Sequence, residues 1–164
     1  MTDFFTLKLL ICLITSFSGS VTFALLFNVK SKHLVMGSIC GLITYAVYYT
    51  VEFFTEMEFF AAFASAVFTA LFSEIAARKK RAPVMVFLIP GIIPTVPGGA
   101  LYRTMRHLIA YEWNLSLDAF LTTMKIALGI AGGIVAVPMI MGIIYDIIDK
   151  CKEKLSEKQK TTEK

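Results

Sequence analysis

Long runs of apolar residues without charges follow one another along most of the chain. They cover residues 9–27, 34–51, 59–73, 82–102 and 126–145. A membrane-spanning helix needs about 20 predominantly apolar residues, so each run except the third can cross a bilayer alone. The third run has 15 residues, and we expect its helix to continue through Glu74 toward Arg78. The pattern predicts an all-α polytopic membrane protein with about five spans in residues 1–145.

Residues 146–164 have a different pattern. They alternate Lys with Glu and show no apolar periodicity. We expect a frayed helix or a disordered segment with a weak attraction to anionic lipid. We assign no chemistry to this charged cytoplasmic tail.

The basic residues predict the orientation of the spans. The links 28–33 and 77–82 and the tail hold 12 of the 16 Lys and Arg residues. By the positive-inside rule these segments are cytoplasmic, which places the N-terminus outside and the C-terminus inside. Asp3 precedes the first apolar run and Lys30 and Lys32 follow it, which is the reverse of a signal peptide. We therefore expect the first run to be retained as a span.

Composition excludes several classes of function. The chain is 57% hydrophobic and 17% charged, with a mean hydropathy of +0.71, which leaves no room for a soluble domain. The net charge of +4 does not indicate nucleic-acid binding, because the basic residues are divided among short links. Cys12, Cys40 and Cys151 lack metal or redox spacing, and we interpret them as free thiols. With no nucleotide-binding loop, no HExxH and no catalytic Ser or Cys with a base, we expect no enzyme activity, cofactor or metal.

The fourth run is rich in helix-breaking residues. Pro90, Pro94 and Pro97 lack a backbone donor, and Gly98 and Gly99 permit other dihedral angles. Irregular backbone at membrane depth is tolerated only where protein buries it or where it lines a wet cavity. We predict a break between Pro90 and Pro97, followed by a half-helix that begins near Gly98. The alternative is that Pro and Gly are simply common in transmembrane helices.

A half-helix that begins near Gly98 suits a carboxylate, because unpaired amides and a positive dipole end would face the membrane interior. Arg103 and Arg106 stand at i and i+3 just beyond, so both can donate to the same anion. The alternative is that these arginines extend to the outer interface.

Two further polar positions invite a functional interpretation. Glu74 and Arg78 stand at i and i+4 and can pair on one face, where Glu74 is either a proton relay or an interfacial acid neutralised by Arg78 and Lys79. Asn28 closes the first span, where it can turn the chain or bind substrate.

In the last span, Gly129, Gly132 and Gly133 form a flat surface that predicts a helix contact. Ser116 is expected to cap the helix of this span.

Several of these residues carry a family resemblance. They are Glu74-Ile75-Ala76-Ala77-Arg78, Pro83, the run from Gly91 to Gly98, Tyr102-Arg103 and the segment from Phe23 to Val29. In these motifs the chain resembles the threonine/serine exporter (ThrE) family, specifically its smaller, C-terminal-half subunit of the YjjB type. The likeness extends to about Tyr145 and leaves out the tail.

The resemblance implies an exporter of small carboxylates or amino acids, such as threonine, serine or succinate, in the cytoplasmic (inner) membrane. A larger ThrE-type subunit would supply the other half, which agrees with the lack of an internal repeat in this sequence. The residues expected to bind substrate are Pro94, Pro97, Gly98, Gly99, Tyr102, Arg103 and Arg106, with Glu74 and Arg78 in proton coupling. A membrane scaffold or assembly subunit is the alternative, and a stand-alone channel is disfavoured because five spans enclose little pore.

Overall fold

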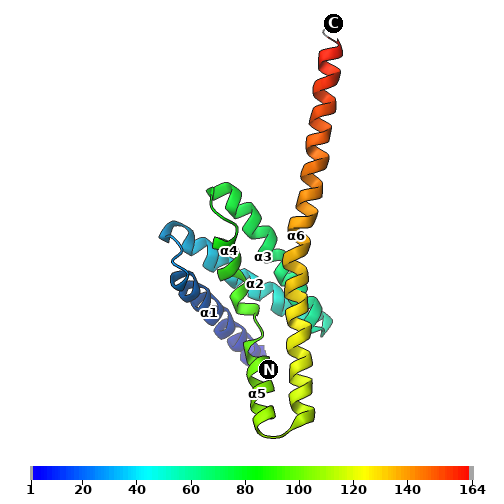
Figure 1. Ribbon diagram of the computed structural model, residues 1–164. Helices are drawn as coiled ribbons and strands as arrows, with labels where there is room; N and C mark the ends of the chain where they lie inside the picture. Colours follow the sequence, from blue (N-terminus) through cyan, green and yellow to red (C-terminus); the bar gives the residue numbers. More distant parts are fainter. Residues whose placement is uncertain (1, 163–164) are drawn as a thin grey trace.

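The computed structural model describes the backbone of residues 2–162 and the side chains of residues 10–143. The described part is helical and contains no strand (Figure 1). Its elements are α1 (Thr2–Leu26), α2 (Ser31–Thr55), α3 (Glu58–Lys80), α4 (Met85–Ile92), the 3-10 helix η1 (Ile93–Thr95), α5 (Gly98–Ile109) and α6 (Trp113–Thr162).

These helices confirm the prediction of about five spans. The segments Ser31–Thr55, Glu58–Lys80 and Trp113–Ile143 are each long and apolar enough to cross a membrane. The pair Met85–Thr95 and Gly98–Ile109 passes the same test as one bent span. The 25 residues of α1 rise about 37 Å at about 1.5 Å per residue, which also exceeds the hydrocarbon core. As expected, α3 continues past the third apolar run through Arg78.

The polar residue at the end of the first span turns the chain. Asn28 has a φ of 54°, a left-handed conformation that Asn tolerates better than most residues. Its amide donates to the carbonyl of Leu25 at 2.9 Å, and the amide of Val29 donates to that of Ala24 at 3.0 Å. This pair of bonds satisfies the last carbonyls of α1 and starts the link to α2.

Helix α3 lies at the centre of the packing because it presents small side chains to its neighbours. Its buried residues are Ala61, Ala62, Ser65, Ala66, Thr69, Ala70, Ser73, Ala76 and Ala77. A Cβ at Gly129 would lie 2.7 Å from the carbonyl oxygen of Phe59, and one at Gly133 would lie 2.6 Å from the Cβ of Ala66. The glycine surface of α6 is therefore a helix contact as predicted, and its partner is α3 of the same chain.

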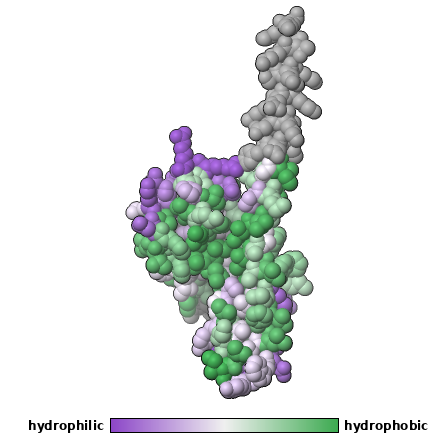
Figure 2. All heavy atoms as spheres, in the orientation of Figure 1, coloured by the Kyte–Doolittle hydropathy of each residue, from purple (hydrophilic) through white to green (hydrophobic). Residues whose placement is uncertain are grey.

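The two basic links lie together at one end of the bundle. Lys30 and Lys32 in the first link and Lys80 in the second all act electrostatically on His33. Figure 1 shows the N-terminal end of α1 and the whole of α5 at the opposite end, and Figure 2 shows hydrophilic side chains gathered around the links above a broad apolar surface. The helices thus alternate in direction as a five-pass protein requires.

The structure corrects the expected start of the last helix. It begins at Trp113, well before the apolar run, and Asp118 and Lys125 remain exposed on its surface. Ser116 is not the cap, because its amide already donates to the carbonyl of Glu112, and its hydroxyl donates to the carbonyl of Thr104 in α5 at 3.0 Å. At the other end the backbone of α6 stays helical to Thr162, while the side chains of the tail lie outside the described residues.

Candidate functional site

The fourth span is broken where the prolines predict. Helix α4, together with η1, meets α5 at an angle of 49°. Pro94 has no amide hydrogen and cannot donate to the carbonyl of Pro90, four residues earlier. Val96 is extended, with φ −62° and ψ 129°, as expected for a residue that precedes a proline. Helix α5 then begins at Gly98, which confirms the predicted half-helix.

The helix before the break is fixed tightly in the bundle. Gly91 is buried, and a Cβ at this position would come within 2.8 Å of the Sγ atom of Cys40 and of the Cγ2 atom of Thr69. The hydroxyl of Thr69 is also 2.8 Å from that of Thr44, which joins α2 to α3 at the same depth. Only a glycine lets α4 approach these two helices so closely, so the break starts from a well-packed position.

The start of α5 is open by comparison. No described side chain caps this helix at Pro97, and a Cβ at Gly98 would meet no atom within 4 Å. The Nη1 atom of Arg103 lies 3.9 Å from the position that a Cβ would take at Gly99. The amides of Gly98 and Leu101 already donate to the carbonyls of Val96 and Pro97, at 2.8 and 3.0 Å. The amide of Gly99 and one guanidinium group are next to the same open space.

The two faces of α5 differ in their contacts. Ala100 and Thr104 are buried on the side of α6, whereas Tyr102 is 68% exposed and Arg103 and Arg106 are also exposed. The predicted anion-binding side chains thus share the outer face of α5, at the surface of this chain.

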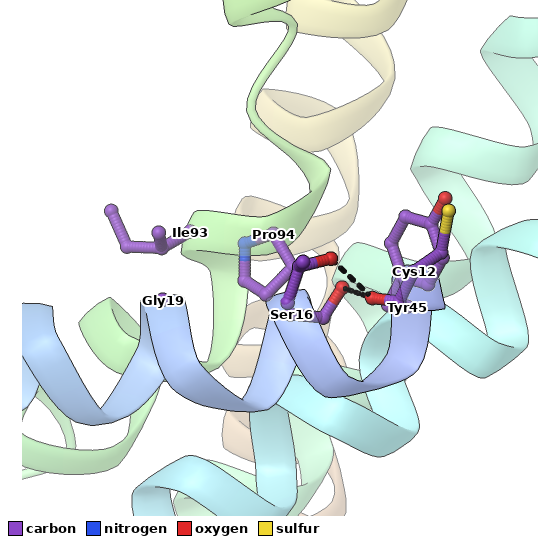
Figure 3. Close-up of a pocket in the computed structure, with 7 residues that line it drawn as sticks. Cys12, Ser16, Gly19, Tyr45, Ile93 and Pro94 are labelled. Carbon is purple, nitrogen blue, oxygen red and sulfur yellow. Dashed lines mark hydrogen bonds between the residues drawn. The ribbon is translucent and has the colours of Figure 1, made fainter. Parts of the chain in front are cut away.

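A cavity of about 260 Å³ lies beside the break, between α1, α2 and η1 (Figure 3). It is lined by Cys12, Thr15, Ser16, Gly19, Tyr45, Ile93 and Pro94. Figure 3 shows Pro94 facing α1 close to Ser16, and the thiol of Cys12 beside the hydroxyl of Tyr45. Pro94 is the only member of this lining that the sequence predicted.

The hydroxyl groups of α1 in this cavity donate to the backbone of their own helix. The hydroxyl of Thr15 lies 2.9 Å from the carbonyl oxygen of Ile11 and 3.0 Å from that of Cys12. The hydroxyl of Ser16 donates to the carbonyl of Cys12 at 2.7 Å. These hydroxyl groups are therefore already paired, the accessible lining of the cavity is mostly apolar, and none of the described residues that line it carries a charge.

Glu74 and Arg78 pair as predicted, at a distance of 3.3 Å. The carboxyl side chain is 19% exposed and the guanidinium side chain 47% exposed. Both lie in the last turns of α3, near the basic links and at the opposite end of the bundle from α5 (Figure 1). The structure does not bring this pair to the break.

A second cavity, of about 660 Å³, lies at the link between α2 and α3. Glu52, Glu56 and Glu58 line it together with Lys125 of α6 and several apolar side chains. This second cavity is separate from the break.

The sequence profile of the threonine/serine exporters, ThrE, matches residues 12–140. The chain belongs to the threonine/serine exporter family. Searches among curated proteins and among solved structures each gave no significant match. The part of the chain that matches this exporter family includes the cavity beside the break, the whole of α5 and the glycine contact between α3 and α6. The family and the apolar helices together make this chain a multi-pass membrane protein of a transporter type.

The sequence did contain a signal for the α1 residues that line the cavity beside the break. Thr15, Ser16, Ser18, Gly19 and Ser20 form a small, polar run in the middle of the first apolar segment. Hydroxyl groups in a transmembrane helix can satisfy themselves on their own backbone, so the run alone does not predict a site. The position of Tyr45 opposite this run depends on how α1 and α2 pack.

Proposed function

We propose that this protein is a subunit of a two-component secondary exporter of small carboxylates or amino acids, of the threonine/serine or succinate type. It acts in the cytoplasmic (inner) membrane, with its N-terminus outside and its C-terminus in the cytoplasm. The observation that carries the proposal is the broken fourth span in a chain of the threonine/serine exporter family. A helix that starts inside a membrane protein, next to a cavity, is the feature by which many transporters bind charged substrates.

The start of α5 is suited to the carboxylate of the substrate. The amide of Gly98 donates to the carbonyl of Val96, but no side chain caps the amides that follow, and the guanidinium of Arg103 lies beside Gly99. A carboxylate there would accept hydrogen bonds from both and would be stabilised by the positive end of the α5 dipole. Pro94, Pro97, Gly98 and Gly99 shape this approach, and Tyr102, Arg103 and Arg106 supply side-chain donors.

Glu74 and Arg78 belong to the coupling of export to protons in this proposal. An acid near the end of a span, only 19% exposed and paired with one arginine, is a proton-relay candidate. Since the pair lies away from the break, it would act on the opening of the cytoplasmic end and not on the substrate itself.

The second component is a larger membrane subunit of the same family. Two observations support it: the sequence has no internal repeat, and the apolar side chains of α5 and the first part of α6 are exposed. The exposed residues include Leu101, Met105, Ile109, Trp113, Leu117 and Phe120. Because α3 covers the glycine surface of α6, that surface is not available to the larger subunit.

The test is an export assay in cells that express this chain alone, the larger subunit alone, or both. Cells loaded with radiolabelled threonine, serine or succinate should release one of them faster than empty-vector cells only when both subunits are present. Robust export by the purified single chain in liposomes would contradict the two-component proposal. A lack of export in every combination, with both proteins present in the membrane, would favour the scaffold function.

A further inference from the structure

We infer that the two basic links and the start of α2 form a binding site for the phosphate group of an anionic phospholipid. The links are residues 28–33, before and at the start of α2, and residues 77–82, at the end of α3. This site lies at the opposite end of the bundle from α5 and uses none of the residues proposed to bind substrate (Figure 1). The inference therefore does not depend on the proposed export function.

The two links carry positive charge that the described part of the chain does not balance. Together they hold six basic residues and no acidic one. Within residues 10–143 the one carboxylate at this end of the bundle is that of Glu74, which pairs with Arg78 at 3.3 Å. Lys30 and Lys32 of the first link and Lys80 of the second all act electrostatically on His33, so the charges of both links meet at the start of α2. Basic residues gathered next to a transmembrane helix attract anionic lipid headgroups.

The start of α2 adds backbone donors to these charges. Helix α2 has 25 residues, its N-cap Lys30 makes no side-chain cap, and its first turn contains no acidic residue. The amide of His33 donates to the carbonyl of Lys30 at 2.8 Å, whereas the amides of Ser31 and Lys32 have no acceptor in the described part of the chain. Exposed amides at the positive end of a long helix bind phosphate oxygens.

The imidazole of His33 adds an independent observation. It belongs to the first turn of α2 and is only 5% exposed, and its Nδ1 atom is buried without a hydrogen-bond partner among the described residues. The ring meets that of Phe87 in α4 edge-on, with 5.4 Å between the centroids. Helical side chains tilt toward the N-terminus of their helix, so this ring leans toward the exposed amides. A buried polar atom without a partner is costly, and an imidazole N–H is a donor that a phosphate oxygen satisfies.

Exposed apolar side chains next to the charges favour a lipid over a free phosphate. On α2, Val35 is exposed and follows Lys32 by three residues, and on α3, Ile75 is exposed and precedes Lys79 by four. Residues at these spacings share one face of a helix, so each basic side chain stands at the end of an apolar surface. Figure 2 shows this order, with hydrophilic side chains around the links and a broad apolar surface below them. The arrangement fits a charged headgroup with acyl chains beneath it.

The test compares two lipids that differ in the charge of the headgroup. The purified full chain in detergent is mixed with dioleoyl phosphatidylglycerol or dioleoyl phosphatidylcholine, and native mass spectrometry measures the lipid bound. The two lipids have the same acyl chains, but only the first carries a net negative charge. We expect phosphatidylglycerol to bind at least about tenfold more tightly than phosphatidylcholine. Equal affinities would overturn the inference.

Two pairs of substitutions that remove the same charge locate the site. Lys32→Gln with Lys80→Gln takes one charge from each link and should weaken binding of phosphatidylglycerol about thirtyfold, since each lysine near an anionic surface contributes a factor of about five. Lys152→Gln with Lys154→Gln takes the same charge from the tail and should leave binding unchanged. Equal weakening by both pairs would mean that the lipid responds to net charge alone and would overturn the inference. Unchanged binding in the first pair would overturn it as well.

His33→Phe keeps a ring against Phe87 and removes both ring nitrogens. It should weaken binding of phosphatidylglycerol about tenfold, the loss of one hydrogen bond to a charged group, and unchanged binding would contradict the site. Thermal unfolding without lipid should be the same for all variants, and Lys30→Gln with Arg81→Gln tests the same two links if the first pair unfolds early. Displacement of the bound lipid by millimolar inorganic phosphate would indicate a site for free phosphate and overturn the assignment to a lipid.

Discussion

Arg103 is the charged residue nearest to the start of the half-helix that follows the break. Its Nη1 atom lies 3.9 Å from the Cβ position of Gly99, and its side chain is exposed at the surface of this chain. In the proposed function, a carboxylate bound by Arg103 would lie between this chain and the larger subunit.

We predict that Arg103→Ala lowers export by at least about tenfold, because each hydrogen bond to a charged group contributes roughly 1.5–3 kcal/mol. Arg103→Lys should restore little, since lysine lacks the planar pair of donors. Initial efflux rates of labelled substrate measure the effect. Lys125→Ala is the matched control. If Lys125→Ala abolishes export while Arg103→Ala exports normally, the proposed site on α5 is wrong.

Glu74 gives a prediction about pH. Glu74→Gln keeps the shape of the side chain but cannot ionise, so the pH dependence of efflux should flatten while substrate binding persists. The measurement is the efflux rate across pH 5–8, with binding of labelled substrate to the purified complex determined in parallel. An unchanged pH profile would mean that Glu74 pairs with Arg78 and does not relay protons.

Single residues were predictable from the sequence where their effect is local. The fourth span breaks between α4 and α5 at Pro94 and Pro97, whereas Pro90 stays inside α4. Glu74 and Arg78 meet because helical spacing alone puts them on one face. Thr15 and Tyr45 share a cavity only because α1 crosses α2 next to η1. That crossing depends on side-chain packing over the whole bundle, which hydrophobic periodicity does not encode.

At the scale of elements, α3 and α6 pack closely because glycines of α6 face the backbone and small side chains of α3. We predict that Gly133→Ala destabilises the protein by about 1–3 kcal/mol, because the new Cβ would lie 2.6 Å from that of Ala66 and 2.8 Å from the carbonyl oxygen of Phe63. Gly142→Ala is the control on the same helix, where a Cβ would meet nothing within 4 Å. It should be neutral or stabilise by at most about 1 kcal/mol.

Thermal unfolding in detergent, followed by the helical signal, compares these two variants. Equal stability of the two variants would mean that the close contact of Gly133 with α3 does not contribute to the stability of the protein. The sequence predicted that the glycines form a helix contact but not which helix they contact, because a GxxxG surface accepts any neighbour with small side chains. The start of α6 at Trp113 was missed because charged residues on an exposed helix face interrupt an apolar run without ending the helix.

For the whole molecule, the two basic links at one end predict the orientation in the membrane. A reporter fused at Lys164 should be cytoplasmic, and one inserted in the link between α2 and α3 should be outside. The reason is that the links 28–33 and 77–82 and the tail hold 12 of the 16 basic residues, and the positive-inside rule places such segments in the cytoplasm. Both reporters on one side would contradict the arrangement of five spans.

The length of helix α6 is a feature of the whole molecule. Its 50 residues rise about 75 Å at about 1.5 Å per residue, far more than a membrane is thick. One end holds α5 through the turn at Ala110–Glu112, the middle rests on α3 at Gly129 and Gly133, and the other end projects past the basic links (Figure 1). The helix therefore extends beyond both the bundle and the thickness of a bilayer, and it connects α5 at one end with the region past the basic links at the other.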